Sequence, residues 1–480
     1  MKNFLFLTFV VFLFSTSHTS AQTKPNIIFI LGDDISWDDI GAYGNRAIKT
    51  PNLDKLAKEG MRFDNMYLTA SSCSPSRTSI LTGRYPHNTG AAELHTPLPG
   101  HLTYFPELLK QKGYFSALAG KWHEGPLTKR AYDTLLVDKD ANGEGGENQW
   151  VNLLRSRPKE KPFFFWLAAY DAHRPWSEQT IGPKHDSDSQ VLIPPTLIDT
   201  KETRLDLAAY YNEISRLDYY VGVLQEELKK QGIADNTIII FTADNGRPFP
   251  GSKTRLTDTG IKTPFIVKWP KVIRAGQTCQ SLISSIDIAP TLLEAGGLKP
   301  AESIQGLSFF SLLKNPDKEF RKYVFAEHNW HDYAAYERSV RSKDFLYIIN
   351  KKPELDNGGP IDANQSSSAK ALKEAKLKGK LTVLQNDAFI KPRPSEEFFD
   401  CFKDPLQVIN LAKDKSYAAK MKILKTVLKN WQDQTGNTFP EKGTPDWYDR
   451  ETGEKLPQNG KRGEMPGKAK NADKINVKGP

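Results

Sequence analysis

The residues with the clearest chemical potential lie between Cys73 and Arg77, in the sequence Cys-Ser-Pro-Ser-Arg. Pro75 suits the first turn of a helix and Ser74 is a candidate cap, so a helix is predicted to start here. The start of a helix presents free backbone N–H groups and the positive end of the helix dipole, which favour an anion. Arg77, one turn further on, adds a cation on the same face. Cys73 is therefore a candidate nucleophile beside an anion site; the alternative is an inert, buried cysteine next to a surface arginine.

Two acidic pairs follow apolar runs of the chain. Asp33 and Asp34 come after residues 26–31, and Asp244 and Asn245 come after residues 237–242. Together they offer three carboxylates and one amide oxygen, hard ligands that suit Ca²⁺ or Mg²⁺. Taken alone, each pair is also compatible with a tight turn or a helix cap.

The apolar runs indicate an α/β fold. The predicted strands are residues 26–31, 115–119, 163–169, 237–242 and 264–269, and residues 52–60 and 206–231 have helical periodicity. Strands that alternate with helices imply a mostly parallel sheet covered on both faces. In such sheets ligand groups collect beyond the carboxyl ends of the strands. We therefore expect the acidic pairs to meet the basic residues Lys121, His123 and His173 at that edge.

The length and composition of the chain limit the possible fold and function classes. At about 100–200 residues per domain, 480 residues predict two or three units, or one large α/β domain with an appendage. With 38% hydrophobic and 11% aromatic residues, the chain can build a core, which excludes wholesale disorder. The net charge of +9 suits many polyanions and does not single out nucleic acid, which we do not expect as a partner. Three cysteines without a Cys-x-x-Cys pair exclude a disulfide framework and a cysteine zinc site.

The two ends of the chain differ from its middle. Residues 1–21 have a short basic start, an apolar run and a small polar end, which predicts a secretory signal peptide and a periplasmic or secreted protein. The apolar run is short for a membrane anchor, so we expect no membrane span after cleavage. We predict a catalytic domain over 22–330, a C-terminal subdomain over 331–440, and a Gly/Pro/Lys-rich tail over 441–480. That tail either wraps over the body or is disordered.

The segment from Cys73 to Arg77, continued by Thr82-Gly83-Arg84, resembles the signature of the type I, formylglycine-dependent sulfatases of the alkaline phosphatase superfamily. Further matches are Gly-Lys-Trp-His at 120–123, His-x-Pro at 173–175 and Ala-Asp-Asn-Gly at 243–246. Within that family the pattern is most similar to heparan N-sulfatase (sulfamidase)-like bacterial polysaccharide sulfatases. The sulfamidase pattern has an arginine where this chain has Lys253, a departure that keeps a cation.

The resemblance implies a fold and a set of site residues. The fold is an alkaline-phosphatase-like, large, mixed and mostly parallel sheet flanked by helices, plus a smaller C-terminal α+β subdomain with a small antiparallel sheet. A maturation enzyme would oxidise Cys73 to formylglycine (3-oxoalanine), and a metal ion, Ca²⁺ rather than Mg²⁺, would be bound. The implied metal ligands are Asp33, Asp34, Asp244 and Asn245, and the implied catalytic residues are Cys73, Arg77, Lys121, His123, His173 and Lys253.

The chemistry of a sulfate ester explains these residue types. The ester is anionic and its cleavage puts charge on the leaving atom, so the site needs cations and a proton donor. As the family resemblance implies, a hydroxyl of the hydrated formylglycine attacks sulfur, and His173 or Lys253 protonates the leaving oxygen or nitrogen. His123 then deprotonates the second hydroxyl and sulfate is expelled.

The substrate is less readable from the sequence. Candidate substrate contacts are His95, Arg247, His331 and Arg338, with a role as surface or interdomain residues as the alternative. We expect an exported sulfatase acting on a sulfated oligo- or polysaccharide, either a glycosaminoglycan or an algal polysaccharide of the ulvan type. The alternatives are a phosphate or phosphonate monoester hydrolase of the same superfamily and a non-catalytic polyanion-binding protein with Cys73 unconverted.

Overall fold

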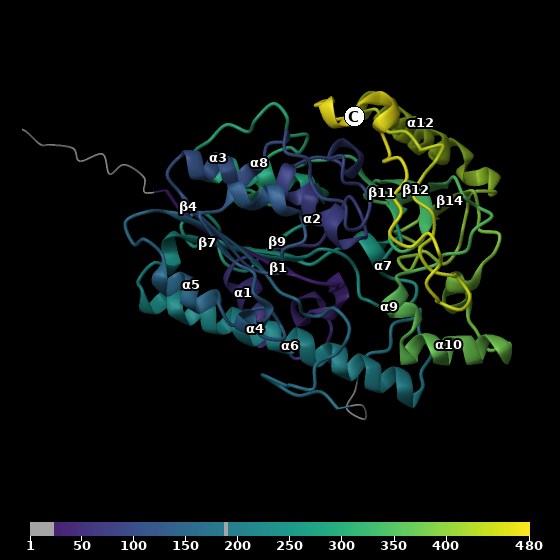
Figure 1. The fold of residues 1–480 in the computed structure, drawn as a ribbon, viewed down its shortest axis with the longest axis horizontal. Coiled ribbons are helices and arrows are strands. Elements are labelled where there is room, and N and C mark those ends of the chain that lie inside the picture. Colours follow the sequence, from purple (N-terminus) through teal and green to yellow (C-terminus); the bar gives the residue numbers. More distant parts are fainter. Residues whose placement is uncertain (1–23, 187–190) are drawn as a thin grey trace, which may run out of the picture.

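The computed structural model describes residues 24–186 and 191–480. It contains one large sheet between two layers of helices, with a second, smaller sheet on one side (Figure 1). The predicted signal peptide at 1–21 lies outside the described residues. Among the described residues, no helix has both the length and the apolar character needed to cross a membrane.

The large sheet has the strand order β5-β4-β6-β1-β7-β8-β2-β9. Its strands are β1 Asn26–Gly32, β2 Met61–Phe63, β4 Phe115–Gly120, β5 Thr134–Leu136, β6 Phe163–Ala168, β7 Thr237–Ala243, β8 Phe265–Lys268 and β9 Gln277–Cys279. The first five strands of that order pair in parallel, whereas β8 is antiparallel to both β7 and β2. This arrangement confirms the predicted mixed, mostly parallel sheet.

Alternate residues of the central strand β1 face different helix layers. Ile27 and Phe29 belong to the core shared with α2 (Cys73–Thr82), α3 (Phe105–Gln111) and α8 (Ile288–Ala295). Ile28 and Ile30 belong to the core shared with α1 (Pro51–Glu59), α5 (Trp150–Ser156) and α6 (Lys201–Lys230). All four side chains are fully buried, and each contributes about 1.5–3 kcal/mol by the hydrophobic effect. A strand buried on both faces reads as a continuous apolar run, which is why the sequence predicted β1.

The smaller sheet is antiparallel, in the order β11-β12-β13-β14. Its strands are β11 Val324–Trp330, β12 Ala334–Arg341, β13 Phe345–Asn350 and β14 Glu396–Asp400. The amphipathic helix α12 (Ala418–Thr435) covers one face and buries Leu424, Leu428 and Trp431 against it. This sheet begins with β11, earlier than the predicted boundary at residue 331.

Short elements complete the two parts. They are β3 Met66–Tyr67 and β10 Ile283–Ser284, which pair with each other, and α4 Lys139–Asn142, α7 Asp258–Ile261, α9 Ile361–Asn364, α10 Ser367–Leu377 and α11 Val383–Asn386. The segment from 441 to 480 lies on the body of the protein. Trp447 packs edge-on against Trp330, and Arg84, which follows α2, donates to the carbonyls of Asp473 and Ile475. Of the two states predicted for the tail, the structure shows the wrapped one.

Candidate functional site

The two acidic pairs meet at the carboxyl edge of the large sheet. Strands β1 and β7 are parallel neighbours in register, with Gly32 opposite Ala243, so the residues that follow them emerge side by side. Asp33, Asp34, Asp244 and Asn245 are all fully buried. The backbone N–H of Asp34 donates to Oδ1 of Asp244 at 3.2 Å, which ties the two pairs together.

Helix α2 begins at Cys73 and presents this residue to the acidic cluster. Cys73 Sγ lies 3.7 Å from Asp33 Oδ1 and 3.9 Å from Asp34 Oδ1. Burial raises the pKa of the Cys73 thiol well above its ordinary value, against the opposing effect of the lysines nearby. The prediction that Ser74 caps the helix is wrong: Ser72 precedes the helix, and Ser74 Oγ instead accepts from the backbone N–H of His95 at 2.8 Å.

Each carboxylate of the cluster has its own cation; Arg77 and Lys253 are buried, and Lys121 is partly exposed. The pairs are Arg77 Nε with Asp244 Oδ2 at 2.7 Å, Lys253 Nζ with Asp34 Oδ2 at 2.8 Å, and Lys121 Nζ with Asp33 Oδ2. Burial raises the pKa of Asp33, but Lys121 and Arg77 outweigh it and hold that pKa well below its usual range. Three carboxylates and three cations balance, so the cluster is neutral without a bound ion.

The donor chemistry of the cluster fits a hard divalent cation. Ligand atoms of the three aspartates and Cys73 all lie within 4.8 Å of one another. The amide nitrogen of Asn245 contacts Asp34 Oδ1, whereas Asn245 Oδ1 is buried and has no hydrogen-bond partner among the described residues. A rotation of the Asn245 amide by about 180° exchanges its oxygen and nitrogen, so that the oxygen joins the three carboxylates as a fourth oxygen ligand. Carboxylate and amide oxygens are the ligands that Ca²⁺ and Mg²⁺ prefer.

Three of the predicted histidines surround this cluster. His173 Nδ1 donates to the carbonyl of Arg174 at 2.5 Å, which leaves Nε2 facing Asp34 Oδ2 at 3.9 Å and Asp362 Oδ2 at 3.8 Å. His95 Nδ1 and His123 Nε2 are 2.7 Å apart. Burial lowers the pKa of His123 well below its ordinary value and that of His95 to about 4, so near neutral pH the two rings are uncharged and one donates to the other.

The predicted substrate contacts separate into two groups. His95 lines the cavity described below, and His331 Nδ1 contacts Ser72 Oγ at 2.8 Å, next to Cys73. Arg247 instead pairs with two acidic residues that follow β1, with Nε 2.9 Å from Asp39 Oδ2. Arg338 is fully buried in the C-terminal sheet, where its Nε donates to Asn437 Oδ1 at 2.7 Å. Both guanidinium groups have internal partners in this structure, and a role for these two arginines as substrate contacts stays a prediction.

A cavity of about 810 Å³ opens onto the cluster. Asp33, Lys121 and the histidines 95, 123 and 173 are among its lining residues. Trp122, Tyr170 and Trp176 add aromatic side chains, and Lys139, Glu144 and Arg216 are among the further charged ones. A cavity lined by both charged and aromatic side chains suits a polar ligand that has an anionic group and an apolar ring face.

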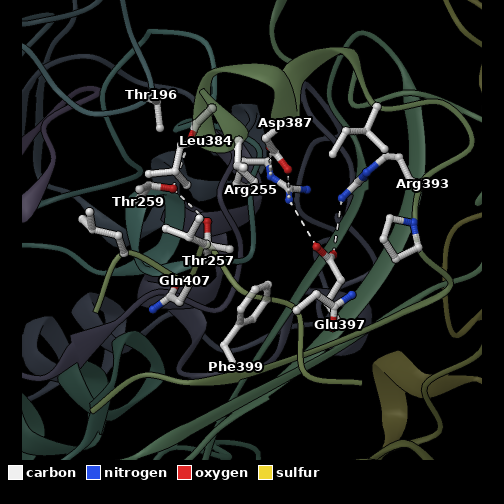
Figure 2. A pocket seen from close by; sticks show the side chains of 17 residues that line it. Thr196, Arg255, Thr257, Thr259, Leu384, Asp387, Arg393, Glu397, Phe399 and Gln407 are labelled. Carbon is white, nitrogen blue, oxygen red and sulfur yellow. Dashed lines mark hydrogen bonds and ion pairs between the residues drawn. The ribbon is translucent and has the colours of Figure 1, made fainter. Parts of the chain in front are cut away.

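A second, separate cavity of about 220 Å³ lies between residues 251–259 and the C-terminal segment 383–410. Figure 2 shows its charged side chains pointing toward one another. Arg255 pairs with Asp387 at 3.1 Å and lies 3.8 Å from Glu397, which is 3.6 Å from Arg393. Its arginines are covered by carboxylates and none of the predicted catalytic residues lines it, so we do not assign it an anionic substrate.

Sequence reasoning missed two carboxylates near the cluster. Asp362 comes from α9 in the C-terminal part, and nothing in its local sequence marks it. Glu124 directly follows the Gly-Lys-Trp-His segment, is fully buried, and accepts from the backbone N–H of His123 at 2.9 Å. Its position next to that segment was the one available signal.

Comparison with known families and proteins agrees with this geometry. The Sulfatase family matches residues 25–298, and the family "N-sulphoglucosamine sulphohydrolase, C-terminal" matches residues 252–352. An ulvan-active sulfatase of Formosa agariphila is 30% identical over 470 residues, covering 86% of this chain and 76% of the relative. The human N-sulphoglucosamine sulphohydrolase is 30% identical over 464 residues, covering 86% of this chain and 91% of that protein.

Solved structures share the fold. A protein in complex with its substrate D-glucosamine-2-N,6-O-disulfate superposes with a TM-score of 0.65 at 23% identity, covering 85% of this chain and 98% of the other. A second structure, in complex with a neocarrahexaose, gives a TM-score of 0.63 at 22% identity and covers 85% and 92% of the two chains.

Proposed function

The chain belongs to the sulfatase family, and we propose that it is an exported enzyme that hydrolyses sulfate groups on a glycosaminoglycan or an ulvan-type algal polysaccharide. One observation carries the chemical part of the proposal. Cys73 Sγ lies at a helix start within 4 Å of two carboxylates, and three cations pair with the carboxylates of this cluster. That arrangement suits a nucleophile that attacks an anionic group.

We propose that Cys73 is oxidised to formylglycine by a maturation enzyme. The hydrated aldehyde would supply the hydroxyl that attacks sulfur. The three aspartates and Asn245 would hold a metal ion, for which we propose Ca²⁺, and such an ion supplies Lewis-acid stabilisation of a sulfate oxygen.

The protein's own side chains then account for binding and proton transfer. Arg77, Lys121 and Lys253 provide preorganised positive charge for the sulfate oxygens. The carbonyl of Arg174 fixes the orientation of His173, so its Nε2 is the atom aimed at the leaving oxygen or nitrogen. His123 is uncharged near neutral pH and is the candidate base that accepts a proton when sulfate leaves.

The substrate class follows from the cavity and the relatives. Sugar rings present apolar faces that pack on aromatic side chains, and three such side chains are among the residues that line the cavity. The names of the relatives specify ulvan and N-sulphoglucosamine. Sulfated sugars of these two kinds are therefore the first to test. Export to a periplasm or the outside, through the predicted signal at 1–21, and a catalytic domain over 22–330 complete the proposal.

The test is sulfate release from a defined panel. It contains N-sulfo-D-glucosamine, D-glucosamine 6-sulfate, sulfated rhamnose, galactose, fucose and uronate oligosaccharides, 4-nitrophenyl sulfate and 4-nitrophenyl phosphate. The enzyme is co-expressed with a formylglycine-generating enzyme, and Cys73→Ala is the control. We expect release from one sugar class that is absent in the variant. Release of phosphate alone would contradict the proposal and favour the phosphomonoesterase alternative.

A further inference from the structure

Asp362 has a carboxylate oxygen that makes no hydrogen bond to any described residue. Asp362 Oδ1 accepts from the backbone N–H of Ala363 at 2.8 Å, whereas Oδ2 is buried and has no hydrogen-bond partner among the described residues. Leaving a buried carboxylate oxygen unsatisfied is costly, so such an oxygen in a native structure calls for a ligand or a function. The side chain as a whole is 24% exposed, so a ligand can reach it.

The C-terminal part holds Asp362 in place. Residue 362 is the second residue of α9, and the first, Ile361, donates its backbone N–H to Asp332 Oδ2 at 2.9 Å. Asp332 follows His331, whose ring contacts Ser72 beside the nucleophile position. The C-terminal part thus reaches the reaction centre at two points, once through the ring of His331 and once through Asp362.

Asp362 Oδ2 lies next to the atom that faces the leaving group, at 3.8 Å from His173 Nε2. Burial lowers the pKa of Lys253, but Asp34 and Asp362 are among the groups that raise it well above its ordinary value. The cations bind the sulfate group itself, and a carboxylate repels it. The substrate atom that meets Asp362 must therefore carry a hydrogen to donate.

From this placement we propose that Asp362 is a specificity-determining residue that accepts a hydrogen bond from a hydroxyl or amino group on the sugar carbon next to the sulfated one. The inference rests on the proposed sulfatase function. The acceptor, Asp362 Oδ2, and the proposed donor to the leaving atom, His173 Nε2, are 3.8 Å apart. This spacing suits contacts with substituents on neighbouring ring carbons. Such a contact selects sugars with a free donor beside the scissile sulfate and rejects those with a second sulfate there, because that sulfate would face a carboxylate.

A cation shared by Asp34, His173 and Asp362 is the competing explanation for the unpaired oxygen, since their ligand atoms lie within 4.8 Å of one another. Asp34 already belongs to the proposed metal site with Asp33 and Asp244. A second cation that shared Asp34 would lie close to the first and be repelled by it. A hydrogen-bond donor on the substrate meets no such opposition.

The experiment compares two kinds of substrate. The sugar substrates are N-sulfo-D-glucosamine, which has a hydroxyl on C3 next to the carbon that bears the N-sulfate, and rhamnose 3-sulfate, which has hydroxyls on C2 and C4 next to the sulfated carbon. The reference substrate is 4-nitrophenyl sulfate, which has no such hydroxyl. The variant is Asp362→Asn, which keeps the shape of the side chain. The matched control is Glu374→Gln, which removes one negative charge from the exposed face of α10 in the same part of the chain.

We expect Asp362→Asn to lower the ratio of kcat/KM for the sugar to that for 4-nitrophenyl sulfate by about 10- to 100-fold, the effect of losing a hydrogen bond to a charged group. Glu374→Gln leaves the ratio unchanged, and circular dichroism with a melting temperature shows that both variants fold. An equal fall on both kinds of substrate, or no fall on either, overturns the inference, as does turnover of the aryl ester but of neither sugar. If wild-type enzyme and Cys73→Ala do not differ on any substrate, the proposed function fails instead.

Discussion

Replacing Lys253 by methionine tests the role of the cations that pair with the three aspartates. Lys253 is fully buried and donates to Asp34 Oδ2 at 2.8 Å. Breaking a buried ion pair on one side costs about 3–5 kcal/mol. His173 still lies 3.9 Å from the same oxygen, so we expect the lower value, about 3 kcal/mol. At about 2.1 cal/mol/K per residue, unfolding 480 residues has an entropy near 1 kcal/mol/K, so Tm should fall by about 3 °C.

The effect of Lys253→Met on activity should be much larger than its effect on stability. Loss of one preorganised donor to developing charge lowers kcat by about 100- to 1000-fold, measured as sulfate release from the best panel substrate. Lys253→Arg keeps the charge and should retain at least about a tenth of the activity. The control is Lys268→Met, which removes another buried lysine of the large sheet, paired with Glu59 at 2.5 Å, and should lower Tm without changing kcat/KM. A kcat/KM for Lys253→Met within about threefold of wild type would refute the reasoning.

Three further outcomes are expected. Ca²⁺ should raise the Tm of the wild-type protein, because at one hundred times its Kd it adds about 2.7 kcal/mol to the free energy of unfolding. The shift should be much smaller in Asp244→Asn, and equal shifts in both proteins would argue against the metal site. Arg255→Met, which leaves Asp387 unpaired in the cavity of Figure 2, should lower stability by about 2 kcal/mol in thermal unfolding, and an unchanged Tm would show that the pair contributes nothing. Burial raises the pKa of Glu327, but His87 and Arg338 outweigh it and lower that pKa to about 2. The ionised Glu327 carboxylate therefore stabilises the folded protein above about pH 4.5, and this stabilisation is lost as the pH falls toward 2. The Tm of Glu327→Gln should change less between pH 5 and 2 than the Tm of the wild-type protein.

The position of the acidic residues at the strand ends was predictable because it follows from one local rule. A buried parallel strand is a short apolar run, and the residue after it lies at the ligand-binding edge. Applied to the sequence alone, that rule predicts that Asp33 and Asp244 lie at the same edge of the sheet. The order of the strands along the sheet does not follow from it, because strand order depends on which faces pack together rather than on any single segment.

The rest of the site depends on contacts between distant segments. Arg247 follows Asn245 closely and looked free in the sequence, yet it reaches back to Asp39, which follows β1. Asp362 lies in a polar stretch with no motif, and only the packing of α9 brings it to His173. Charge alone could not distinguish an arginine committed to a buried partner from one available to a ligand.

The most direct test measures turnover against the conversion of Cys73. Preparations made with increasing amounts of a formylglycine-generating enzyme are assayed for sulfate release, and the peptide that contains residue 73 is quantified by mass spectrometry in its cysteine and formylglycine forms. If formylglycine at position 73 is the nucleophile, the rate is proportional to the converted fraction, and neither the unconverted protein nor Cys73→Ala releases sulfate. Sulfate release that is independent of the converted fraction would contradict this role of formylglycine.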